Sequence, residues 1–206
     1  MRTDFQCGEM CRALSDRGNI RKLDHIPDLY KNNYNGECYS SVYRYRPDYT
    51  PKGYKGPVWA CGLHFDLDGA TAQPDTRELL ERLCIDATGL YVDDLHIYFS
   101  GNKGFHIYAL STEIQELEPS AAVPQRIKAI CKKLAGDLPS FDVAVYDSSR
   151  IFRVANSRHQ KSKLYKIPLY ATEIFNLSMD QIKRLAVQKR SLHDIKTIKG
   201  FIHGIA

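Results

Sequence analysis

Apolar and polar residues alternate along several short stretches of the chain, which is the pattern of strands with one buried face. The most apolar of these stretches is 58–68, read VWACGLHFDLD, and it predicts a strand buried in a central sheet. Two further stretches, 94–100 and 105–110, flank the sequence GNKG, whose glycines allow the backbone of a tight turn, so they predict a hairpin. Strands are also predicted at 37–46, 141–146 and 164–170.

Three stretches space their apolar residues three and four apart and therefore predict helices. They are 74–87, which opens with proline and acidic residues, 121–138, which Gly136 ends, and 178–189, which Ser178 caps. Strands, hairpin and helices in this order predict an α+β fold with a mostly antiparallel sheet.

The chain reads as one domain, because no internal repeat interrupts it and the one expected flexible connector is short. That connector is 46–57, which is dense in Pro, Gly and Lys. The expected parts are an N-terminal part of undefined role (1–57), a motif-bearing core (58–170) and a helical C-terminal part (171–206).

Composition fits an ordinary globular protein and argues against a membrane protein. Of 206 residues, 43% are hydrophobic and 26% charged, which is enough apolar material for a sizeable core. Neither a signal-peptide-like start nor an apolar run of bilayer length is present, so we expect an intracellular protein, cytoplasmic or, in a eukaryote, nuclear.

The charge balance permits a polyanionic partner. Twenty-nine Lys and Arg stand against 24 Asp and Glu, a net charge of +5. The basic residues are dense from 149 to 190, whereas acidic residues gather between 66 and 94. A one-sided basic region of this kind is typical of nucleic-acid contact.

Six scattered cysteines predict free thiols in a reducing compartment. Cys7 and Cys11 are four apart, so on a helix they would share a face and could join Cys38 or His25 around zinc. We favour the alternative that they are small buried apolar residues.

Two carboxylates end the most apolar stretch. Asp66 and Asp68 are two apart, so on a strand they project from one face while Phe65 and Leu67 pack on the other. Burying unpaired carboxylates is costly, and their hard oxygen atoms suit Mg²⁺ or Mn²⁺. The pair therefore predicts a platform for divalent metal, with a solvent-exposed strand end as the alternative.

The hairpin turn offers anion-binding groups. In SGNKGFH, Ser100, Lys103 and His106 surround two glycines, so backbone can approach an anion while three side chains supply hydrogen-bond donors. The order of residues differs from that of a Walker loop. We expect a phosphate cradle, with a plain hairpin turn as the alternative.

A third stretch combines an acid with basic residues interleaved with apolar ones. Asp142 stands in the predicted strand 141–146, and Arg150, Arg153 and His159 follow. The interleaving implies partial burial, and partly buried arginines require anions.

These three motifs in this order resemble the archaeo-eukaryotic primase superfamily, the fold of primase small subunits and primase-polymerases. The resemblance covers about half the chain, 58–169. It implies a core with an RRM-like, mostly antiparallel sheet and flanking helices, fused to a second αβ lobe. It departs from many family members in that the interval between the first two motifs shows no zinc-binding insertion.

The resemblance also implies site roles. Asp66 and Asp68 would bind two Mg²⁺ or Mn²⁺ ions, and the nucleotide triphosphate would be bound by Ser100, Lys103, His106, Arg150, Arg153 and His159. The third metal-binding acid is assigned to Asp142, because a strand would hold it rigidly. Asp147 is the alternative, in a turn where we expect a local capping role.

The implied activity is template-directed nucleotidyl transfer, by a DNA primase or primase-polymerase, on single-stranded DNA with NTP or dNTP, with a helicase as a possible replication partner. Lys161, Lys163, Lys166 and the basic stretch 183–190 would hold the template. Two other functions stay open. The first is a non-catalytic RRM-like module that stacks bases on Tyr98, Phe105 or Tyr108. The second is a metal-dependent phosphodiesterase.

Overall fold

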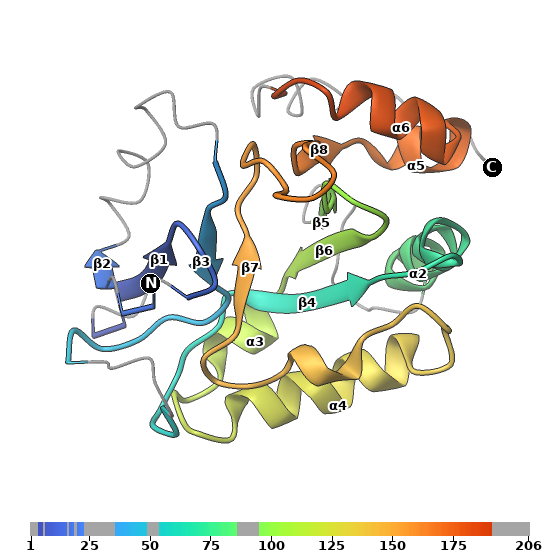
Figure 1. The fold of residues 1–206 in the computed structure, drawn as a ribbon. Coiled ribbons are helices and arrows are strands. Elements are labelled where there is room, and N and C mark those ends of the chain that lie inside the picture. Colours follow the sequence, from blue (N-terminus) through green and yellow to red (C-terminus); the bar gives the residue numbers. More distant parts are fainter. Residues whose placement is uncertain are drawn as a thin grey trace.

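The described chain forms two four-stranded antiparallel sheets with helices around them, as the computed structural model shows (Figure 1). The structure describes residues 4–5, 7–15, 17–18, 20–22, 36–48, 54–85 and 95–190. The strands are β1 (Cys7–Cys11), β2 (Ile20–Lys22), β3 (Tyr39–Ser41), β4 (Gly62–Leu67), β5 (Leu95–Phe99), β6 (Phe105–Leu110), β7 (Ile151–Arg153) and β8 (Ile167–Leu169). The helices are α2 (Ala72–Ile85), α3 (Thr112–Glu116), α4 (Val123–Ala135), α5 (Ala171–Asn176) and α6 (Met179–Leu185), with a 3-10 helix at Val143–Val145.

The central sheet has the order β4-β6-β5-β8 and two different faces. On one face Phe65, Ile107 and Ile97 lie opposite one another on adjacent strands, and all three are buried. Helices α2 and α4 pack against β4, and α4 lies along it in Figure 1. Burial of this apolar face against helices gives the sheet its fixed register, because a one-residue slip would turn the apolar side chains outward.

The opposite face of the central sheet is polar. Asp66 on β4, His106 on β6 and Tyr98 on β5 form one row across it. The second sheet, in the order β2-β1-β3-β7, lies over this face, and Phe152 of β7 packs its ring 4.6 Å from the ring of His106, centroid to centroid. The polar row therefore lies between the two sheets.

The predicted α+β class with antiparallel pairing is confirmed, as are the hairpin of β5 and β6 and the three predicted helices. The helix predicted at 121–138 is α4, which Gly136 ends, and Ser178 caps α6 by accepting a hydrogen bond from the backbone N–H of Gln181. Among the described residues, no helix combines the length and the apolar character needed to cross a bilayer.

One expectation about local structure is wrong. The stretch 141–146 was expected to be a strand, but Val143–Val145 is a 3-10 helix. Cys7 and Cys11, considered for a helix in the zinc hypothesis, begin and end the buried strand β1. Strands β1, β2 and β7 and helices α3 and α5 were not predicted, because three to six residues carry too little periodicity to identify an element. The predicted connector 46–57 lies partly outside the described residues.

Gly62 marks the closest approach of β4 to β6. A Cβ at Gly62 would lie 2.0 Å from the carbonyl oxygen of Ala109, which is backbone and cannot rotate away. We expect Gly62→Ala to destabilise the protein by about 1–3 kcal/mol, because β4 and β6 must separate to accept the methyl group. Thermal unfolding would measure this. Leu110→Ala, which shortens the exposed side chain opposite Gly62, is the control and should cost less. Equal stability of Gly62→Ala and the parent protein would contradict the prediction.

Candidate active site

The carboxylates of Asp66 and Asp68 stand at the end of β4 on its polar face, as predicted. Asp66 is partly buried and Asp68 is about half exposed. The backbone N–H of Asp68 donates to the carbonyl of Ser140 at 2.8 Å, which fixes the chain just after β4 ends. The two carboxylates are therefore held by backbone pairing on a well-packed strand.

Asp142 lies directly beside Asp66, although it does not belong to a strand as expected. It caps the 3-10 helix, its Oδ1 accepting a hydrogen bond from the N–H of Ala144 at 2.8 Å. Its own N–H donates to the carbonyl of Asp66 at 2.9 Å, and Phe141 forms a β-bridge with Leu67. Asp142 was expected to be held rigidly by a strand; this short backbone pairing with β4 holds it instead. The pairing also places Asp142 opposite Asp66.

The pKa of Asp66 is raised, in part by the two neighbouring carboxylates. The pKa of Asp66 rises to about 7, first because it is buried and then because the charges of Asp142 and Asp68 repel its ionised form. The charges of Lys166 and Arg150 act in the opposite direction but do not outweigh these effects. A cation placed here would relieve a repulsion that the protein alone leaves in place.

The donor set fits a hard divalent cation, but the side chains are not arranged around one. Within the described parts of the chain, no three or more His, Cys, Asp and Glu side chains are close enough together to hold a metal ion. The carboxylate of Asp142 faces its cap hydrogen bond, and that of Asp68 lies 3.4 Å from Lys103 Nζ. Both interactions would have to give way for the three carboxylates to share a metal, which rotation about χ1 or χ2 can achieve without moving β4.

The glycine turn of the hairpin reaches the acids. Ser100 and Gly104 exchange hydrogen bonds across it, from Ser100 N–H to the Gly104 carbonyl at 2.9 Å and from Gly104 N–H to Ser100 Oγ at 3.2 Å. Gly101 has a φ of +91°, which glycine adopts without strain. A Cβ at Gly104 would lie 2.4 Å from the carbonyl of Leu67. The turn thus needs both glycines to place Lys103 next to Asp68.

His106 faces Asp66 across the β4–β6 pairing. Its Nε2 lies 3.7 Å from Asp66 Oδ1, and the ring is buried under Phe152. Burial, together with the charges of Lys166 and Arg153, lowers the pKa of His106 well below its ordinary value. The imidazole is therefore neutral at physiological pH, with one nitrogen as donor and the other as acceptor.

Lys166, expected on a template-binding surface, is instead buried at the centre of the molecule. It is 2% exposed, and its Nζ lies 2.8 Å from Nδ1 of His106. Burial lowers the pKa of Lys166 to about 7, while the nearby charge of Asp66 acts to raise it. The sequence holds one signal of this burial. Lys166 directly precedes IPL, the apolar part of a predicted strand, and a residue beside a buried strand is often shielded from solvent.

Arg150 is close to the acids, and Asp147 orients it. The guanidinium donates to the carbonyl of Ala144 at 2.9 Å and pairs with Asp147 Oδ2 at 2.7 Å. Asp147 Oδ1 accepts from the N–H and the Oγ of Ser149, which is the local turn-capping position expected of it. Asp147 thus has local partners, whereas Asp142 adjoins Asp66.

Arg153 was expected to bind the triphosphate, and its guanidinium already has partners within the chain. It donates to Glu37 Oε1 at 3.1 Å, to the hydroxyl of Tyr39 at 2.8 Å and to the carbonyl of Arg158 at 3.1 Å. It also stacks over the ring of Tyr39. Its charge is nevertheless near enough to His106 and His159 to lower the pKa of both.

His159 lies against the glycine turn. Its Cβ is 3.3 Å from the position that a Cβ would take at Gly101, and the neighbouring Ser162 donates its hydroxyl hydrogen to the Gly101 carbonyl. Burial and the charges of Arg153 and Lys161 lower the pKa of His159. His159 and the glycine turn, both predicted to bind the triphosphate, thus meet at one place.

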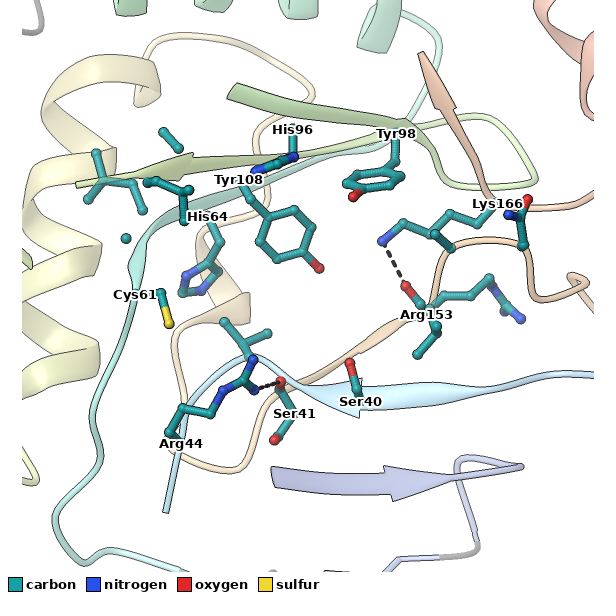
Figure 2. A pocket seen from close by; sticks show the side chains of 18 residues that line it. Ser40, Ser41, Arg44, Cys61, His64, His96, Tyr98, Tyr108, Arg153 and Lys166 are labelled. Carbon is teal, nitrogen blue, oxygen red and sulfur yellow. Dashed lines mark hydrogen bonds between the residues drawn. The ribbon is translucent and has the colours of Figure 1, made fainter. Parts of the chain in front are cut away.

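A cavity of about 720 Å³ lies between the two sheets next to this site (Figure 2). The second sheet contributes Ser40 and Ser41, and the central sheet contributes Tyr98 and Tyr108. Lys166 and Arg153 line its end, joined by the dashed hydrogen bond in Figure 2. Sequence patterns did not predict the cavity, because its walls come from segments more than a hundred residues apart.

Comparisons with known proteins bear on this site. No protein-family model matches the chain. Two curated relatives are both named DNA primase small subunit. The one from Picrophilus torridus is 23% identical over 82% of this chain, and the one from Thermoplasma volcanium is 26% identical over 74% of it. The resemblance to the archaeo-eukaryotic primase superfamily is confirmed. The chain spans about half the length of these relatives, 45% and 48% respectively.

One solved structure is also similar. It is the polymerase domain from Mycobacterium tuberculosis ligase D in complex with DNA, with a TM-score of 0.48 and 16% identity. The match covers 94% of this chain and 75% of that one.

The cysteines considered for zinc do not form a site among the described residues. Cys7 and Cys11 are buried as free thiols in β1, and Cys38 is partly exposed. His25, the fourth candidate ligand, lies outside the described residues. The described thiols are consistent with the expected role of small apolar residues.

Neutralising Asp66 should stabilise the metal-free protein at neutral pH. In the unfolded chain Asp66 ionises near 3.8, whereas in the folded chain it ionises near 7. The unfolded state therefore releases its proton first, and folding loses stability as the pH rises between these values. We expect Asp66→Asn to gain about 1–4 kcal/mol over the parent at pH 8 and almost nothing at pH 3.5.

Denaturant unfolding in the presence of a chelator, at both pH values, would measure this gain. Asp137→Asn is the control, since Arg82 pairs with Asp137 and lowers its pKa. This control should lose stability or stay unchanged at pH 8. A gain for Asp66→Asn that is equal at both pH values would contradict the assignment of the raised pKa.

Proposed function

We propose that this chain is a template-directed nucleotidyl transferase, a DNA primase or primase-polymerase that makes or extends short primers on single-stranded DNA. The observation that carries the proposal is the placement of Asp142, Asp66 and His106 side by side on paired backbone, with the glycine turn beside Asp68. The names of the two curated relatives support it. Because the chain spans about half their length, their activity is extended to it here as a proposal.

Asp66, Asp68 and Asp142 would hold two divalent cations, Mg²⁺ or Mn²⁺. Such ions lower the pKa of a primer 3′-hydroxyl and neutralise the charge that develops on the triphosphate. The raised pKa of Asp66 supports a cation here, because a metal would favour the ionised form that the neighbouring carboxylates oppose.

The groups around the glycine turn would bind the triphosphate. Lys103 is half exposed and held near the acids by Asp68, so it can turn to a phosphate oxygen without a desolvation cost. Ser100 and His159 lie at the same turn, and Arg150 is near enough to Asp66 for its charge to lower the pKa of that carboxyl. Positive and neutral donors around the acids would hold the reacting phosphorus in line with the attacking hydroxyl.

Arg153 stays a predicted triphosphate ligand, but its contacts favour a supporting role. Glu37 and Tyr39 already occupy three of its hydrogen-bonding positions together with the Arg158 carbonyl. A nucleotide phosphate that bound this guanidinium would compete with Glu37 for it. Template binding falls to the exposed lysines Lys161 and Lys163 and to the last turn of α6, now without Lys166.

The packing of the aromatic residues disfavours the RRM-like binding module. Phe105 is fully buried against the core, and Tyr98 and Tyr108, which are partly buried, pack edge to face with each other under the second sheet. A stacking platform needs ring faces open to bases, and these rings face Phe152 and Lys166 instead.

Primer synthesis without a primer is the direct test. The protein would be incubated with single-stranded DNA, labelled nucleotide and Mn²⁺, and the products separated by size. We expect short oligomers from the parent protein and at least a hundredfold fewer from Asp66→Asn and Asp68→Asn, which keep the fold but lose the carboxylates. Template degradation would favour a phosphodiesterase. Template binding without any product, with or without a supplied primer, would favour a binding module.

The two candidate third acids can be separated by paired substitutions. Asp142→Asn keeps an oxygen to cap Ala144 but loses the charge beside Asp66, so we expect synthesis to be abolished with stability retained. Asp147→Ala removes a turn cap and a partner of Arg150. It should cost on the order of 1 kcal/mol of stability and raise the nucleotide KM modestly. Synthesis rates and unfolding curves of both variants would be compared. Activity in Asp142→Asn together with none in Asp147→Ala would reverse the assignment.

A further inference from the structure

Lys166 joins the two sheets at the polar row through three kinds of contact. Its Nζ lies 2.7 Å from the carbonyl oxygen of Arg153 on β7 and 2.8 Å from Nδ1 of His106 on β6. It also lies over the rings of Tyr98 and Tyr108, 4.8 and 5.3 Å from their centroids. Figure 2 shows the side chain reaching from just before β8 toward the two tyrosines, with a dashed hydrogen bond to Arg153.

Burial lowers the pKa of Lys166 to about 7, so below neutral pH it is an ammonium, and in that form its partners fix the direction of each hydrogen bond. A carbonyl oxygen only accepts, so Lys166 donates one hydrogen to Arg153. The faces of Tyr98 and Tyr108 attract a cation, which favours an ammonium with hydrogens to spare and no lone pair. The contact with His106 Nδ1 is then a donation from Lys166, and Nδ1 is the accepting nitrogen of the imidazole.

We propose that Lys166 is a positioning residue that holds His106 in the tautomer with its hydrogen on Nε2, directed toward Asp66 and the phosphate-binding turn. The role in catalysis rests on the proposed nucleotidyl transferase activity. The tautomer itself does not, since it follows from contacts within this chain. Neither the sequence patterns nor the resemblance to primases assigns Lys166 a part in the site.

The tautomer decides what His106 offers to a ligand. Nε2 is the nitrogen near Asp66, 3.7 Å from Oδ1, and it lies on the side of the three carboxylates. With hydrogen on Nε2, the ring donates to an anionic oxygen; with hydrogen on Nδ1, it would present a lone pair and repel that oxygen. The same lysine anchors β7 through the Arg153 carbonyl, so Phe152 stays packed on the ring and limits its rotation.

The test measures the tautomer of His106 by two-bond ¹H–¹⁵N correlation NMR of the full chain in chelator, with no nucleotide. The signals of His106 would be assigned from their loss in His106→Gln. We expect the parent protein to show a single tautomer protonated on Nε2. A parent protein with His106 protonated on Nδ1 would overturn the proposal by itself, whatever the variants do.

Lys166→Met keeps an unbranched chain of similar length but removes the donor. We expect His106 to show a mixture of tautomers or the Nδ1-protonated form. The nucleotide KM should rise about tenfold with little change in kcat, as expected when a contact made equally in the ground state and the transition state is lost. Lys132→Met removes the same charge from the exposed face of α4 and should change neither quantity. A folded Lys166→Met with an unchanged His106 tautomer would refute the positioning role.

Failure of the proposed function would look different. Suppose that the parent protein makes no primers, but His106 holds the Nε2 tautomer and loses it in Lys166→Met. The positioning of His106 by Lys166 is then supported, and the proposed nucleotidyl transferase activity is refuted. If Lys166→Met does not fold, the parent tautomer decides alone.

Discussion

Crowding of negative charge around Asp66 is the constraint on which the rest of the site depends. A partly buried carboxylate with two acidic neighbours is costly, and the pKa of Asp66 near 7 expresses that cost. The fold keeps the three acids together because their backbones are paired: Asp142 donates to Asp66, and Asp68 to Ser140. Repulsion between the carboxylates can rotate these side chains apart, but the backbone pairing keeps β4 and the segment 140–142 together.

The two-faced central sheet explains how the chain supports this arrangement. Its apolar face packs on α2 and α4, and the burial of that face stabilises the fold enough to offset the destabilising charges on the polar face. The second sheet then covers the polar face incompletely. Phe152 closes the region over His106, while the edge near Asp68 and Lys103 stays about half exposed. The site is therefore buried around His106, where packing fixes the side chains, and open around Asp68 and Lys103, where a ligand can enter.

Sequence patterns predicted the parts of the site that lie on long elements, and they failed where short segments cross. Asp66, Asp68 and the glycine turn were placed correctly because β4 and the hairpin are long enough to show alternation. Asp142 was given the wrong local structure because FDVAVY alternates like a strand, yet the cap hydrogen bond to Ala144 begins a 3-10 turn. Lys166 was misplaced because charge alone indicates a surface, and its buried partners come from three other strands.

The basic residues in and around the site fall into two groups that differ in their surroundings. Lys166 and Arg153 are buried, and each already makes hydrogen bonds within the chain, with which an incoming anion would have to compete. Lys103 and Arg150 are more exposed and pair with single acids in high dielectric, interactions that cost little to exchange. The chain therefore uses its buried cations to hold the architecture and its exposed cations to meet a ligand. The spacing of these residues in the sequence does not separate the two groups, because burial depends on which strand crosses above each one.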